Sequence, residues 1–158
     1  MKPIIRRAES RDVPRMLELV NELAVFEKAP EEVTVTLEHM REAGFGPAPV
    51  WVGWVAEVDG LIVGMAICYV RYSTWKGRRL YLEDIVVTEV ARGKRIGEAL
   101  FRACAAHAVA RGYDGMTWQV LDWNKDAVRF YERLGATISK AWWNGSLERE
   151  RLMELGKR

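Results

Sequence analysis

The sequence predicts a mixed α+β fold, and three observations support this prediction. Two β-rich runs, "VWVGWVAEV" and "LIVGMAICYVRY", are separated only by Asp59 and Gly60, a dipeptide typical of tight β-hairpins. A third β-rich run, 80–87, follows a short polar segment, so the three strands should form an antiparallel meander. The remaining chain alternates helical and extended patterns. This order fits a purely parallel, doubly wound sheet poorly.

The N-terminal part should contain one strand and two helices. The segment "PIIRRA" is predicted as the first strand. Ser10 is expected to cap the following helix, because apolar residues recur at helical spacing from Val13 to Ala24. The segment "TLEHMREAG" has the composition of a short second helix that stops at Gly44.

The C-terminal part should continue with further helices and strands. Apolar residues from Ile96 to Val109 keep helical spacing, and this helix should end near Gly112. The run "GMTWQVLDW" is predicted as a buried strand, and "KDAVRFYERL" as a helix with Asn124 as its cap and Gly135 as its stop. The segments "ATISKAWW" and "SLERERLMEL" are predicted as a final pair of strands. About four helices and six to seven strands are therefore expected.

Length and composition limit the classes of function. A chain of 158 residues is expected to form one domain, 1–158. Its 24 basic and 22 acidic side chains leave a net charge of +2, far from the basic excess of a nucleic-acid binder. No apolar run approaches the roughly 20 residues of a membrane span, and the lack of an apolar signal region predicts a cytoplasmic protein. Cys68 and Cys104 should be free thiols, and no metal-ligand pattern is present in the sequence.

The segment "ARGKRIGEAL" is predicted to bind an anion at the start of a helix. Gly93 and Gly97 permit close backbone approach, and the first amides of a helix lack backbone partners. Arg92, Lys94 and Arg95 add three cations, so dipole and charge together could hold a pyrophosphate. The alternative is an ordinary capped helix with a solvated basic turn, because short glycine motifs are weak evidence.

Four further motifs occur in order along nearly the whole chain: "NELAVFEKAPEEV", "YLED" before "IVV", "DWN" before a helix, and "RFYERLGA" at that helix's end. With the basic turn, which is similar to a Q/R-x-x-G-x-G/A segment, they resemble the GNAT superfamily of N-acetyltransferases. The resemblance is to the spermidine/spermine (diamine) branch and its bacterial relatives. It implies a GNAT-like central sheet, mixed and mostly antiparallel, with acetyl-CoA as acetyl donor. The family pattern has glycine where this chain has Arg95, so that side chain should point away from the phosphates.

The resemblance also implies which residues contact the acetyl donor. A bulge in the strand at Ile85 to Val87 would admit the pantetheine arm, and a backbone amide there would form an oxyanion site. Asn124 would hydrogen-bond the same arm, with helix capping as the alternative role. The implied cofactor-binding residues are Ile85, Val86, Val87, Arg92, Gly93, Lys94, Arg95, Ile96, Gly97, Glu98, Asn124 and Tyr131.

Transfer of acetyl to an amine requires a group that removes a proton, because an alkylammonium has a pKa of about 10.4. Carboxylates at Glu83 and Asp84, with Glu27 and Asp122 as further candidates, could attract the amine and relay its proton. The resemblance selects Glu83 as the catalytic acid on the substrate side and Tyr131 as the general acid for the departing thiolate. The alternative for Glu83 is an exposed strand carboxylate with no catalytic role, and the alternative for Tyr131 is a tyrosine packed in the core. The expected substrate-binding residues are Phe26, Glu27, Glu83, Asp84, Trp118 and Asp122.

Two classes of function remain open. The first is an acetyl-CoA-dependent N-acetyltransferase, acting by direct attack in a ternary complex on the primary amine of a small cationic acceptor. That acceptor is expected to be a short diamine, a polyamine, lysine or a thialysine-like compound; peptide or aminoglycoside acetylation is also open. The second is a CoA-binding module without turnover. The segment "SKAWWNGS" carries fewer acids than polyamine enzymes of the branch, which favours a compact amine. The branch further implies a homodimer.

Overall fold

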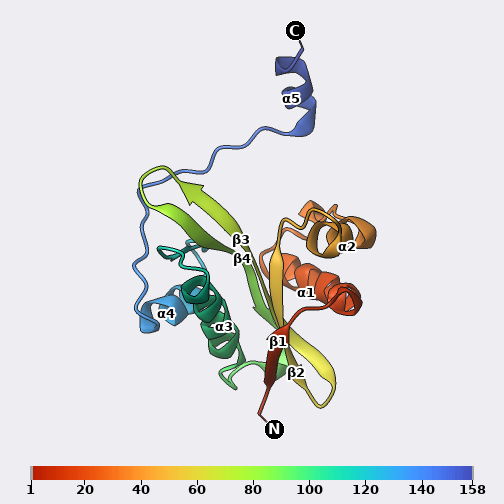
Figure 1. Cartoon of the computed structure of the whole chain (residues 1–158), viewed down its shortest axis with the longest axis vertical. Helices are drawn as coiled ribbons and strands as arrows, with labels where there is room; N and C mark the ends of the chain where they lie inside the picture. The colour runs from red at the N-terminus through yellow and green to blue at the C-terminus, as the bar shows by residue number, and fades with distance from the viewer. Residues whose placement is uncertain (1, 158) are drawn as a thin grey trace. The chain divides into compact units, whose positions relative to one another are not determined.

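The structure, a computed structural model that describes residues 2–157, contains one open sheet of five strands (Figure 1). The strands lie in the order β1-β2-β3-β4-β5, and every pair is antiparallel except β4 and β5. Their bounds are β1 Ile4–Arg7, β2 Val52–Val58, β3 Leu61–Ser73, β4 Gly77–Val87 and β5 Met116–Thr117. The predicted mixed α+β class with a mostly antiparallel sheet is confirmed, but the described residues form five strands instead of six or seven.

Five α-helices accompany the sheet in the described part of the chain, one more than expected. They are α1 Val13–Phe26, α2 Leu37–Phe45, α3 Ile96–Ala110, α4 Lys125–Arg133 and α5 Arg149–Leu155, with short 3-10 turns at Ser10–Asp12, Pro30–Glu32 and Glu89–Ala91. The chain divides into two compact units, residues 2–119 and 120–157 of the described part. The sheet with α1, α2 and α3 forms the first unit, whereas α4 and α5 belong to the second.

The core of the first unit lies on both faces of the sheet. Helices α1 and α2 cover one face, and α3 covers the other (Figure 1). The α1 side is a cluster of buried apolar residues that includes Val13, Met16, Leu19, Met65, Ile67 and Val86. On the α3 side, Leu100, Cys104 and Cys68 are fully buried. A hydrogen bond to Cys104, together with burial, raises the pKa of the Cys68 thiol, so Cys68 stays protonated. Both cysteines are free, as predicted.

The β2–β3 hairpin forms as the sequence predicts. Val58 pairs with Leu61, and the two connecting residues, Asp59 and Gly60, have φ of 53° and 79°. Positive φ at both positions is the geometry of the tight turn whose twist matches the flanking strands. The predicted stop signals at Gly112 and Gly135 are also confirmed, since both adopt positive φ just beyond α3 and α4.

Two predicted helix boundaries are wrong. Ser10 does not cap α1, because it begins a short 3-10 turn in which the Asp12 carboxylate accepts a hydrogen bond from the Glu9 amide at 2.8 Å. Helix α2 does not stop at Gly44 but continues to Phe45. A Cβ on Gly44 would overlap the indole of Trp51, so this glycine serves close packing inside the helix.

The two C-terminal strands are a further correction. Residues 136–148 form no strand in the structure, and the end of "SLERERLMEL" is helix α5. Glu, Arg, Leu and Met favour helices, and Arg151 pairs with Glu154 one turn away at 2.6 Å. The run "GMTWQVLDW" contributes only the two residues of β5. Across residues 2–157, no helix is long and apolar enough to cross a membrane.

Candidate active site

A β-bulge in β4 places Glu83 outside the regular pairing of the sheet. Ile67 of β3 lies opposite Asp84, and the next residue, Cys68, lies opposite Leu82, so Glu83 is the extra residue. On its other side, β4 pairs with β5 only at Leu80 and Tyr81. Among the strands of the described chain, none pairs with that edge of β4 beyond Tyr81. The edge of β4 beyond Tyr81, next to Glu83, is therefore not paired with another strand of the described chain.

Three carboxyl groups interact at this open edge. Burial, together with the negative charges of Glu83 and Glu27, raises the pKa of Asp84 from 3.8 to about 6. Burial also raises the pKa of Glu27, which is the C-terminal cap of α1. The structure thus brings together three of the predicted substrate-binding residues. Together the three carboxyl groups attract a cation, and Asp84, with its pKa of about 6, can exchange a proton near neutral pH.

Two tyrosines border the carboxylates, and sequence reasoning missed both. Tyr69 and Tyr81 lie opposite each other on β3 and β4, with ring centroids 5.0 Å apart. Burial raises the pKa of each hydroxyl, and the charge of Glu83 raises it further, so both remain hydrogen-bond donors. The guanidinium of Arg71 lies 5.7 Å from the Tyr81 ring. The β3–β4 register, counted outward from the connection between Ser73 and Gly77, is the signal that could have found these residues.

Phe26 and Arg92 join the end of α1 to the end of β4. The Arg92 guanidinium lies 5.3 Å from the centroid of the Phe26 ring, and its Nε donates to the Val87 carbonyl at 3.0 Å. Arg92 was predicted to contact phosphate, and the structure places its side chain against Phe26. Val86 lies opposite Met65 and contributes its side chain to the buried core. Ile85 is half-buried opposite Ala66.

The basic turn leads directly into α3 without a side-chain cap. Gly93 has φ of 79°, and Arg95 adopts the left-handed conformation with φ of 59°. This explains the family's glycine at position 95, since glycine adopts that conformation without strain. The Arg95 side chain pairs with Glu98 at 3.2 Å, and Glu98 also pairs with Arg102. Ile96, Gly97 and Glu98 form the first turn of α3, whose amides point toward the turn. Lys94 is exposed and has no ion-pair partner within residues 2–157.

The remaining predicted residues lie on other elements. Trp118 follows β5 and packs edge-on against Phe101 of α3, with ring centroids 5.3 Å apart. In the second unit, the Asn124 side-chain oxygen caps α4 by accepting from the Ala127 amide at 3.2 Å, so its predicted capping role is confirmed. The Asp122 carbonyl accepts from Lys125 at 2.6 Å. Tyr131 lies within α4.

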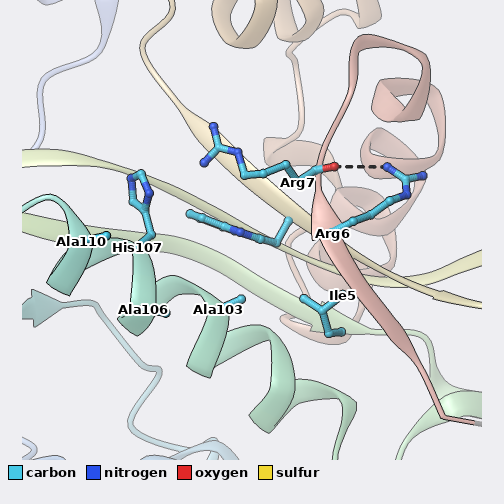
Figure 2. Close-up of a pocket in the computed structure, with 8 residues that line it drawn as sticks. Ile5, Arg6, Arg7, Ala103, Ala106, His107 and Ala110 are labelled. Atoms are coloured by element: carbon cyan, nitrogen blue, oxygen red, sulfur yellow. Dashed lines mark hydrogen bonds between the residues drawn. The ribbon is translucent and has the colours of Figure 1, made fainter.

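A separate hollow of about 480 Å³ lies between β1, β2 and α3, on the face opposite the carboxylates (Figure 2). Arg7 stacks over Trp54 at 4.8 Å, and Trp54 lies edge-on to His107 with centroids 5.1 Å apart. Burial lowers the pKa of His107, as do the charges of Arg7 and Arg111. This hollow contains none of the predicted site residues. In residues 2–157, no group of three His, Cys, Asp or Glu side chains could hold a metal ion.

Comparisons with known proteins agree on one family. The family described as "Acetyltransferase (GNAT) family" matches residues 7–136. The thialysine N-epsilon-acetyltransferase of Mus musculus is 38% identical, over 98% of this chain and 97% of its own length. The spermidine/spermine N(1)-acetyltransferase-like protein 1 of Homo sapiens is 31% identical over 96% of this chain, which spans 23% of that longer protein. A crystal structure of an aminoglycoside N-acetyltransferase in complex with CoA has the same fold, with a TM-score of 0.74 and 16% identity over 94% of this chain and 95% of the other.

Proposed function

Because this chain belongs to the acetyltransferase (GNAT) family and is an N-acetyltransferase, we propose that it transfers the acetyl group of acetyl-CoA to the primary amine of a small cationic acceptor. The observation that carries this proposal is the group of three carboxyls, Glu27, Glu83 and Asp84, at the open edge of β4. A cationic amine is attracted there by charge, and its proton has a nearby acceptor. The thialysine and spermidine/spermine names of the relatives support the same class of acceptor.

The start of α3 fits the pyrophosphate of the acetyl donor. Its amides are not capped by a side chain, Lys94 adds an exposed charge, and the turn carries two residues with positive φ. Acetyl-CoA supplies an activated thioester. The backbone of Ile85 to Val87, beside the bulge, is proposed to bind the pantetheine arm and to donate an amide to the carbonyl oxygen. From the sequence resemblance, Asn124 is proposed to contact the same arm through its side-chain nitrogen, since its side-chain oxygen caps α4.

Glu83 is proposed to take the proton from the bound ammonium and pass it to solvent. The bulge holds this residue outside the strand register, next to the Tyr69 and Tyr81 hydroxyls. The neutral amine nitrogen then bonds to the acetyl carbonyl carbon while the carbon–sulfur bond breaks, and the nitrogen loses its second proton to solvent. Asp84 and Glu27 keep the site negative, which favours the cation before it loses its proton. Tyr131 is proposed, from the sequence resemblance, to donate a proton to the departing sulfur. The sequence resemblance to the diamine acetyltransferase branch is also the basis for proposing that the protein is a homodimer.

The proposal is tested by mixing the purified protein with acetyl-CoA and single amines. The amines are lysine, S-(2-aminoethyl)cysteine, putrescine, spermine, an aminoglycoside and a short peptide. Free thiol release and the mass of the amine product are measured together. Acceptor-dependent thiol release with a 1:1 acetylated small amine is expected. Binding of acetyl-CoA without product from any amine would mean a CoA-binding module, and acetylation of the peptide or aminoglycoside alone would contradict the proposed acceptor.

A further inference from the structure

Arg71 is a positively charged side chain on the same face of the sheet as the carboxylates. In the β3–β4 register, Tyr69 lies opposite Tyr81 and Arg71 lies opposite Arg79. Alternate residues of a strand share a face, so Tyr69 and Arg71 share the face of Ile67, which packs in the α1-side core. Ile67 is in turn opposite Asp84. Arg71 and the acids therefore lie on one surface.

The two tyrosine hydroxyls lie between opposite charges. Glu83 raises the pKa of Tyr69 and of Tyr81 beyond the effect of burial, whereas Arg71 lowers both. Both rings are thus within electrostatic reach of the acid and of the guanidinium. One end of this strip is negative, and the other end is positive.

The guanidinium of Arg71 is not engaged by an acid in the described chain. Its contact there is with the Tyr81 ring at 5.7 Å. By comparison, Arg6 pairs with Asp12 and Glu57, and Arg15 pairs with Glu18 and Glu22. Arg71 is also exposed, so its five donors are open to a ligand. A planar guanidinium suits a carboxylate, which it can bind through two parallel hydrogen bonds.

The spacing fits a basic amino acid. The Arg71 guanidinium lies over the ring of Tyr81, at the level of Tyr69 in the register. From Tyr69 to Ile67, which lies opposite Asp84, is two residues, or about 7 Å along a strand. The side-chain nitrogen and the carboxylate carbon of extended lysine are separated by roughly the same length, from standard bond lengths. On the basis of the proposed function, we propose that Arg71 binds the carboxylate of the acceptor while its terminal ammonium lies at Glu83 and Asp84. The enzyme then selects a diamine that carries a carboxylate, and Arg71 repels the second ammonium of a polyamine.

Lysine and cadaverine form the decisive pair of acceptors, because cadaverine is lysine without its carboxylate. Values of kcat/KM are measured for both with the wild type and with Arg71→Gln. The wild type should prefer lysine. In Arg71→Gln the lysine value should fall by about 10-fold to 100-fold, the range for a lost charge-assisted hydrogen bond. The cadaverine value should stay level or rise, because the repulsive charge is gone. Arg71→Lys keeps the charge and should restore part of the preference.

The matched control is Arg78→Gln, which removes the same charge from the opposite face of β4, since Arg78 pairs with Tyr72. This variant should keep the wild-type ratio of lysine to cadaverine. Equal kcat/KM for the two amines in the wild type, or an equal fall for both in Arg71→Gln, would overturn the role of Arg71 and leave the acetyl-transfer proposal standing. Absence of product from either amine, and from the wider panel of amines, would overturn both proposals.

Discussion

Asp84, at the open edge of β4, is a residue whose ionised form is destabilised by its surroundings in the folded protein. Its carboxyl group is buried and lies within reach of two other acids, so ionisation in the folded protein is opposed from two sides. The sequence identified Asp84 and Glu83 as adjacent acids, but it could not say which of them is buried. That distinction depends on the bulge, which breaks the alternation of side chains between the two faces of a strand.

This placement predicts a pH-dependent effect of Asp84→Asn on stability. The pKa of Asp84 is about 6 in the folded protein and 3.8 ordinarily, so the folded state binds the proton more tightly. The stabilisation from this group is complete below pH 4 and is lost as the pH rises through 6. Asparagine carries no titrating proton. The free energy of unfolding of the variant, relative to wild type, should therefore rise by roughly 1–3 kcal/mol between pH 4 and pH 7.5.

Urea unfolding at both pH values measures this difference. Because the comparison is between two proteins at the same pH, other titrating groups contribute equally to each. A difference that is the same at both pH values would show that Asp84 titrates as an ordinary surface acid.

At the level of elements, local patterns predicted the meander, the β2–β3 turn and helices α1 to α4. These features depend on residues close in sequence, such as Asp59 and Gly60. The prediction of two C-terminal strands was wrong because a strand forms only when another strand pairs with it, and the sequence of "ATISKAWW" does not show whether such a partner is present. Tyr69, Tyr81 and Arg71 were missed for a related reason, since their proximity to Glu83 follows from the register of a hairpin. The basic turn and the start of α3 were predictable because their residues are contiguous in the sequence.

The turn before α3 yields a second prediction. Arg95 has φ of 59°, which costs a residue with a Cβ about 1 kcal/mol. Arg95→Gly should therefore leave the free energy of unfolding unchanged or raise it by up to about 1 kcal/mol, although the exposed pair with Glu98 is lost. Lys94→Gly is the control, because Lys94 has no positive φ and glycine there should destabilise by about 0.5–1 kcal/mol. Thermal unfolding of the two variants compares them, and equal losses would show that no strain is stored at Arg95.

For the whole molecule, the proposed homodimer has a candidate surface at the outer end of β3. Val70 and Tyr72 share the face opposite Arg71, and both are exposed, as is the nearby Trp75. Light scattering should give twice the mass of one chain, and Tyr72→Asp should shift the protein toward monomer by placing a charge in an apolar contact. A wild-type mass equal to one chain at every concentration would exclude the dimer, and a dimer insensitive to Tyr72→Asp would place it elsewhere.

The acids at the open edge of β4 are proposed to receive the acceptor amine while the start of α3 binds the donor. Steady-state kinetics of Glu83→Gln test it most directly, with lysine and acetyl-CoA varied separately from pH 6.5 to 9.5. The kcat/KM for the amine should fall by about 10²-fold at pH 7 and recover partly toward pH 9.5, where a larger fraction of the amine is neutral. The KM for acetyl-CoA should change by less than about two-fold. An unchanged kcat/KM for the amine at pH 7, or an effect confined to the KM for acetyl-CoA, would contradict this assignment of the two binding sites.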